Sequence, residues 1–240
     1  MSARKPTRAE RREHARRERA DIERRRARAR RNQRMGVLLV LLLIGGGIVF
    51  AATRPRPEVA QVGDLLARAD SAAEAAGCTD VGAPGAYDPE DQDRSHVETM
   101  PPLESYPSTP PASGPHSDST LPAGVYDSPP QIEQALHSLE HGAIIVWYDP
   151  SAAGPEVDRI ETFFRESDNG DHTIVAPYEY EGPAGVLPGG TGMALVAWHH
   201  LQTCARPSLP VAAGFANAYR MPTIAGGEYA GEAPEPGAPI

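Results

Sequence analysis

Cysteine is scarce in this chain, with Cys78 and Cys204 the two present among 240 residues. Two cysteines so far apart exclude both a CxxC redox pair and a zinc site made of four thiolates. In an oxidising compartment the two are expected to form a structural disulfide, and two unpaired thiols are the alternative. The chain also lacks a G-x-S-x-G motif, which argues against a serine hydrolase with a nucleophile elbow.

Positive charge is sparse beyond the N-terminal region. Residues 1–34 hold 15 Lys+Arg and 5 Asp+Glu, whereas residues 35–240 hold 8 and 27, so the net charges are +10 and −19. Such a split indicates two compartments rather than one surface. An acidic domain disfavours polyanionic ligands, so we expect no nucleic-acid partner.

Residues 35–52 carry no charge and are apolar or glycine throughout. With their neighbours they are long enough to span a bilayer, so we predict a transmembrane helix at 35–54 that binds the chain to the lipid bilayer. Residues 1–34 form a basic tail, and the positive-inside rule places it in the cytoplasm and the remaining chain outside the cell membrane. A cleaved signal peptide is the alternative, but 34 residues far exceed an ordinary charged leader region.

The outer part is predicted to be one α+β domain at 55–223 with a small sheet, a few helices and a long proline-rich loop. Residues 62–76 predict a helix that stops at Gly77. The 11 prolines of residues 82–130 exclude regular structure there, and the interspersed histidines and tyrosines favour an ordered wrapping loop over disorder.

The later part of the domain has clearer periodicity. Ser128, two prolines and Gln131 suggest a capping box for a helix that runs to His141 and ends at Gly142. Further helices are expected at 155–166 and near 208–220. Apolar runs predict strands at 143–148, 173–178 and 193–198. Residues 224–240 are predicted to form a flexible C-terminal tail.

The segment His137-Ser138-Leu139-Glu140-His141 carries the strongest chemical signal. On a helix, His137 and His141 lie one turn apart on one face, so both imidazoles can reach one metal ion. His116 follows a Gly-Pro turn that can hold a third imidazole. In an extended segment His96 shares a face with Met100. Imidazole suits zinc or copper, and a thioether from Met100 favours copper.

Other interpretations of these residues are open. The histidines can be structural, or part of a protein-contact surface, and Glu140 can pair with a basic neighbour. The letters HSLEH also fit the H-x-x-E-H zinc-hydrolase motif, in which Glu140 activates a metal-bound water. Gly142 ends the helix at once and no later helical glutamate ligand is evident, so this reading is disfavoured.

Tyr106, P-P-A-S-G-P-H (110–116), Gly124-Val125-Tyr126 and L-H-S-L-E-H-G (136–142) occur in this order before a predicted strand. This series, preceded by His96-Val97, resembles the membrane-anchored bacterial proteins grouped as domain of unknown function 3105. The resemblance covers roughly residues 74–200 and implies the anchored α+β arrangement but no established activity. Its late-strand motif is matched loosely by residues 197–204, which leaves open whether His199 and His200 belong to the shared set.

We therefore expect an extracytoplasmic domain that binds one copper or zinc ion through His96, His116, His137 and His141. Met100 and Glu140 are accessory, with Glu140 orienting a ligand. Metal storage or delivery follows from such a site more naturally than catalysis. The competing hypothesis is a non-catalytic interaction module or assembly subunit of a membrane complex, with a membrane-protein partner.

Overall fold

The computed structural model describes residues 62–240, which form an α+β domain around a five-stranded mixed sheet. This confirms the predicted class and the small sheet. The predicted basic tail at 1–34 and transmembrane helix at 35–54 lie outside the described residues. Within 62–240, none of the helices has both the length and the apolarity needed to cross a membrane.

The strands follow the apolar runs of the sequence. They are β1 (Gly124–Val125), β2 (Ile144–Tyr148), β3 (Thr173–Pro177), β4 (Met193–Ala197) and β5 (His200–Cys204). Their order in the sheet is β1-β3-β2-β4-β5. The pairs β1–β3 and β3–β2 are parallel, whereas the pairs β2–β4 and β4–β5 are antiparallel. Central β2 is covered on both faces, which explains why all five of its residues are apolar and buried.

The helices are α2 (Val62–Leu66), α3 (Ala69–Ala76), α4 (Ile132–Glu140), α5 (Pro155–Phe164), α6 (Ser167–Gly170) and α7 (Leu209–Tyr219). The single helix predicted over 62–76 is wrong, because a tight turn in which Arg68 N donates to Leu65 O separates α2 from α3. The predicted stop is confirmed, since Gly77 caps α3 in the left-handed conformation with φ of 67°.

Helix α4 begins later than its sequence signal suggests. Its N-cap residue is Gln131, and no side chain caps it, so the predicted capping box from Ser128 does not form. A residue that precedes proline disfavours the helical conformation, and both Ser128 and Pro129 precede prolines. Helix α4 ends as predicted, with Gly142 at a φ of 86° directly after His141.

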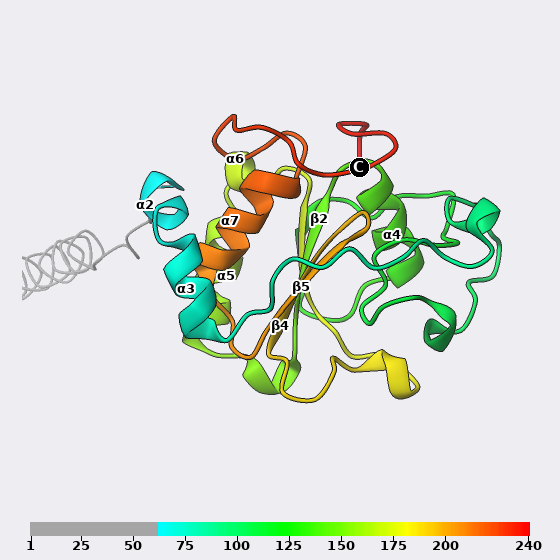
Figure 1. Ribbon diagram of the computed structural model, residues 1–240, viewed down its shortest axis with the longest axis horizontal. Coiled ribbons are helices and arrows are strands. Elements are labelled where there is room, and N and C mark those ends of the chain that lie inside the picture. The colour runs from blue at the N-terminus through cyan, green and yellow to red at the C-terminus, as the bar shows by residue number, and fades with distance from the viewer. Residues whose placement is uncertain (1–61) are drawn as a thin grey trace, which may run out of the picture. The chain divides into compact units, whose positions relative to one another are not determined.

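Two hydrophobic layers sandwich the sheet. Alternate residues of β2 point to opposite faces: Ile144 and Val146 join the cluster under α5 and α7, whereas Ile145 and Trp147 join the cluster under α4. Figure 1 shows α7, α5 and α3 on one side of the sheet and α4 on the other. Helix α4 thus packs an apolar face, with Leu136 and Leu139, against the sheet.

The proline-rich residues 82–130 wrap around the α4 side of the domain with short 3-10 turns, Glu90–Gln92 and Leu103–Ser105. Two further 3-10 turns occur at Pro150–Ala152 and Pro183–Gly185. Residues 224–240 have no regular structure, but Gly237 N donates to His141 O at 2.9 Å. The C-terminus accordingly lies near the end of α4 in Figure 1.

Candidate metal-binding site

A rigid turn holds His116 in the interior. Gly114 has a φ of 120°, and a Cβ atom there would lie 2.6 Å from the ring of Tyr106, so this position requires glycine. The hydroxyl of Tyr106 donates to Pro115 O at 2.6 Å, and burial raises the pKa of Tyr106 well above its usual range. The turn and its tyrosine therefore fix the imidazole of His116, which is fully buried.

His96 is brought beside His116 by a parallel β-bridge between these two residues. Val97 N donates to His116 O at 2.8 Å, and His116 N donates to Ser95 O at 3.0 Å. Bridged residues project on the same side of the backbone, so the two rings lie close together, with centroids 5.0 Å apart. Half of the His96 side chain, 49%, is exposed to solvent.

Helix α4 contributes His137 and Glu140 from one face, because residues three apart in a helix are neighbours. The helix is tied to the proline-rich segment by Ser138, whose buried hydroxyl accepts from Leu121 N at 2.9 Å and donates to Leu121 O at 2.8 Å. This double hydrogen bond fixes how far α4 lies from the loop that carries His116.

The four side chains of His96, His116, His137 and Glu140 converge, and each offers one ligand atom within 4.8 Å of the others. We call these four residues the histidine group. The ring of His137 lies 4.7 Å from that of His96 and 5.0 Å from that of His116, measured between centroids. Three imidazoles and one carboxylate at this spacing could hold a metal ion.

Glu140 is a buried anion held by two partners. Arg94 Nε donates to its Oε1 at 2.7 Å, and His116 Nε2 lies 3.0 Å from its Oε2. Burial by itself raises the pKa of Glu140, but the hydrogen bonds and charges of His116 and Arg94 outweigh it and lower the pKa to about 2. A full negative charge is therefore present beside the imidazoles at neutral pH.

His137 has a free nitrogen in the interior. Its Nδ1 atom is buried and has no hydrogen-bond partner among the described residues. Burial, followed by the neighbouring histidines, lowers the pKa of His137, so its ring is neutral at pH 7. Leaving a buried polar atom unpaired costs about 1–3 kcal/mol, which a bound cation offsets.

The tautomer of His116 also fits a cation. Its Nδ1 lies 2.8 Å from Gly114 O. Because a carbonyl oxygen only accepts, Nδ1 carries a proton there, so a hydrogen bond from Nε2 to Glu140 Oε2 needs a second proton on the ring, whose place a metal ion can take. A lone pair facing a carboxylate at 3.0 Å is favourable when a cation, either a proton or a metal ion, lies between them. A carbonyl behind the ring is the usual orienting partner of a metal-binding histidine.

The structure unites His96, His116 and His137 as the sequence predicts, but it brings Glu140 rather than His141 into the group. His141 is the C-cap of α4, and its ring lies 4.7 Å from that of His137, but it is not among the four converging residues. Met100 is partly buried against the cluster under α4. Arg94 was missed by sequence reasoning, since an arginine two residues before His96 in a loop gives no pattern to follow.

The remaining predicted positions are accounted for elsewhere in the domain. The Sγ atoms of Cys78 and Cys204 lie 2.05 Å apart, the distance of a disulfide, which confirms the predicted pairing. His199 occupies the turn between β4 and β5 with a φ of 57°, and its Nε2 lies 2.8 Å from Asp93 Oδ2. His200 begins β5 and contacts Trp198 O through Nδ1 at 2.8 Å.

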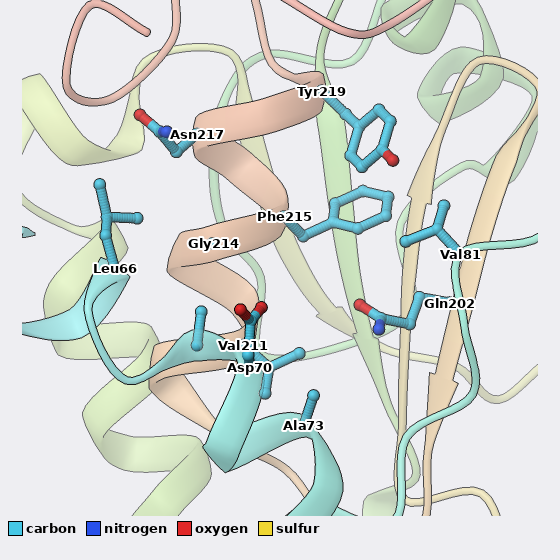
Figure 2. Close-up of a pocket in the computed structure, with 11 residues that line it drawn as sticks. Leu66, Asp70, Ala73, Val81, Gln202, Val211, Gly214, Phe215, Asn217 and Tyr219 are labelled. Carbon is cyan, nitrogen blue, oxygen red and sulfur yellow. The ribbon is translucent and has the colours of Figure 1, made fainter.

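A separate cavity of about 300 Å³ lies between α3, α7 and β5. Figure 2 shows its apolar walls, with Val81, Val211 and Phe215, and the polar side chains of Asp70 and Gln202. None of the histidines lines it. The cavity therefore has no cluster of converging titratable side chains. The histidine group has one, so it is the better candidate for a functional site.

Comparison with known proteins adds family membership. A family model described as protein of unknown function (DUF3105) matches residues 96–236, which is more than half of the chain. The match begins at His96 and includes every residue of the histidine group. No curated protein and no solved structure matches the chain.

Proposed function

We propose that this chain, which belongs to the DUF3105 family of proteins of unknown function, binds one transition-metal ion through His96, His116 and His137. The observation that carries the proposal is the buried, unpartnered Nδ1 of His137 within a group of converging ligand atoms. A buried polar atom without a partner calls for an explanation, and a metal ion supplies one.

The ligand set favours zinc or copper. Imidazole nitrogens and a carboxylate oxygen suit both ions. In a tetrahedral site with bonds near 2.0–2.1 Å, ligand atoms lie roughly 3.3 Å apart. The distances from Glu140 Oε2 to His116 Nε2, 3.0 Å, and to His96 Nε2, 3.8 Å, bracket that spacing.

Glu140 is proposed as the fourth ligand rather than as a residue that orients one. The orienting partner of His116 is Gly114 O, on the Nδ1 side of the ring, whereas Glu140 lies on the Nε2 side, where the ion would bind. Arg94 then orients Glu140 from behind. Since both carboxylate oxygens of Glu140 have partners, binding is favoured over hydrolysis with Glu140 as general base.

Storage or delivery of the ion is the role that the exposure of the group supports. His96 is half exposed, so an ion in the group can exchange with a donor or acceptor in solution. The disulfide supports a position outside the cytoplasm, because disulfides persist in oxidising compartments. We propose, with the apolar residues 35–52 as membrane anchor, that the site faces the exterior.

Metal content of the full chain, purified without a polyhistidine tag, tests the proposal. After incubation with Zn²⁺ or Cu²⁺ and desalting, we expect one retained ion per chain. His137→Gln should lose it, whereas the control His200→Gln, which removes an imidazole elsewhere in the domain, should retain it. If the unaltered chain retains no ion, the metal proposal is wrong and the interaction-module hypothesis becomes the better one.

A further inference from the structure

A second histidine–carboxylate pair lies directly beside the histidine group. His141 Nε2 is 3.7 Å from Glu235 Oε2. The two side chains come from distant parts of the sequence, His141 from the end of α4 and Glu235 from the C-terminal segment. The side chain of His141 is 14% exposed and that of Glu235 is 56% exposed, so this pair lies at the surface.

The pair repeats the arrangement of His116 and Glu140. His141 Nδ1 lies 2.8 Å from Pro239 O, which only accepts, so the proton is on Nδ1. Nε2 is then the ring nitrogen that faces Glu235. The separation of 3.7 Å is longer than a hydrogen bond and suits two ligands of one cation.

The backbone of the C-terminal segment fixes this geometry. Glu235 N donates to Glu140 O and Gly237 N donates to His141 O, each at 2.9 Å. Both acceptors are carbonyls at the end of α4, which have no partner within the helix. The segment thus caps the helix, and the cap sets the carboxylate of Glu235 beside His141.

The surface pair, His141 and Glu235, lies next to the histidine group. The ring of His137 lies 4.7 Å from that of His141 and 5.0 Å from that of the fully buried His116. Arg94 connects the two carboxylates, with Nε 2.7 Å from Glu140 Oε1 and Nη2 4.0 Å from Glu235 Oε1. The imidazoles of His141, His137 and His116 therefore form a row from the surface to the fully buried ligand.

We propose that His141 and Glu235 form an outer, weaker position for a divalent transition-metal ion, from which the ion passes by way of His137 into the histidine group. This inference rests on the proposed function, because the outer position loads the inner one. Two protein ligands and solvent bind an ion loosely, which suits transfer. Four converging ligands hold it, which suits retention.

Stopped-flow mixing of the metal-free full chain with Cu²⁺ tests the inference. The ring of Trp198 lies 6.0 Å from that of His116, so an ion that reaches the histidine group should quench tryptophan fluorescence. We expect Glu235→Gln to slow the quenching by about tenfold, the lower end of the effect of a focused charge on association. An equilibrium titration should show a second, weaker ion in the unaltered chain, and this ion should be lost in Glu235→Gln and in His141→Gln.

Glu232→Gln is the matched control. Glu232 lies in the same C-terminal segment, is 66% exposed and has Oε2 3.7 Å from a histidine nitrogen, Nδ1 of His199. The Glu232→Gln substitution removes the same charge at the same distance from an imidazole, so this variant should take up the ion at the rate of the unaltered chain. Equal slowing in both variants would show general electrostatic attraction and overturn the outer position.

The outcomes separate the two proposals. The outer position is refuted if the unaltered chain retains one ion and binds no second ion, and if Glu235→Gln takes up that one ion at the same rate. The proposed metal-binding function is then unaffected. In that case His141 and Glu235 are an ion pair only. A chain that retains no ion at all refutes the proposed function, and the inference with it.

Discussion

Replacement of Glu140 by glutamine tests the electrostatics of the histidine group in the metal-free chain. The carboxylate is buried, with 4% of its side chain exposed, and its pKa is lowered from 4.5 to about 2 by partners that outweigh the effect of burial. Because the folded state favours the charged form, Glu140 stabilises the fold at pH values above its unfolded-state pKa. That contribution is lost as the pH falls through the window from 4.5 to about 2.

The magnitude follows from the size of the shift. One pKa unit corresponds to about 1.4 kcal/mol, so the charged Glu140 contributes about 3 kcal/mol to the free energy of unfolding at pH 7. At pH 3 the remaining contribution is roughly 1 kcal/mol. Glu140→Gln keeps the shape but removes the charge, so its destabilisation should shrink by about 2 kcal/mol between pH 7 and pH 3.

Urea unfolding with a chelator present, followed by tryptophan fluorescence, measures this difference. The control is Glu133→Gln, which makes the same substitution on the same helix, where the carboxylate has no hydrogen bond or ion pair with any described residue. It should change the free energy of unfolding by less than about 0.5 kcal/mol at either pH. A Glu140→Gln destabilisation that is absent at pH 7, or equally large at both pH values, would show that the charge of Glu140 does not stabilise the fold.

Three further variants test the surroundings of the site. Gly114→Ala, which meets the Tyr106 ring at a φ of 120°, should lower the free energy of unfolding by about 1–3 kcal/mol and weaken metal retention, as urea unfolding and metal analysis would show. His137→Leu should abolish metal retention yet leave the metal-free fold at least as stable, because an unpaired buried nitrogen is removed. The lowered pKa of His137 makes the native chain lose stability as the pH falls below 6.5, so the advantage of leucine should grow from pH 7 to pH 5 in unfolding measurements. Cys78→Ser with Cys204→Ser opens a covalent link across 126 residues and should lower the free energy of unfolding by about 4–5 kcal/mol, measured against the oxidised chain.

Local patterns predicted most of the regular structure. Apolar runs predicted β2, β3 and β4, and glycines at positive φ ended α3 and α4 where expected. The predicted helix boundaries were wrong where adjacent residues or a turn changed the backbone conformation. Prolines beside Ser128 moved the start of α4, and a tight turn at Arg68 divided the first helix.

The candidate site was also predicted only in part, because local patterns do not show which distant segments lie together. His137 and Glu140 share one helix, so their proximity follows from helical geometry alone. His96 and His116 join them through a β-bridge and a glycine turn, which depend on how the proline-rich segment wraps over the sheet. The sequence therefore predicted three of the four residues of the group, and it did not predict that Glu140 rather than His141 completes it.

His137 belongs to the histidine group and His141 does not, and the sequence alone does not predict this difference. Helical spacing allows both imidazoles to reach one ion, and the sequence determines that much, along with the apolar strands and the paired cysteines. Only the tertiary structure decides that the C-terminal segment holds the ring of His141 through Pro239, while Arg94 holds Glu140 beside His116. These contacts join residues far apart in the chain, and their free energy depends on packing and burial, which local pattern does not encode.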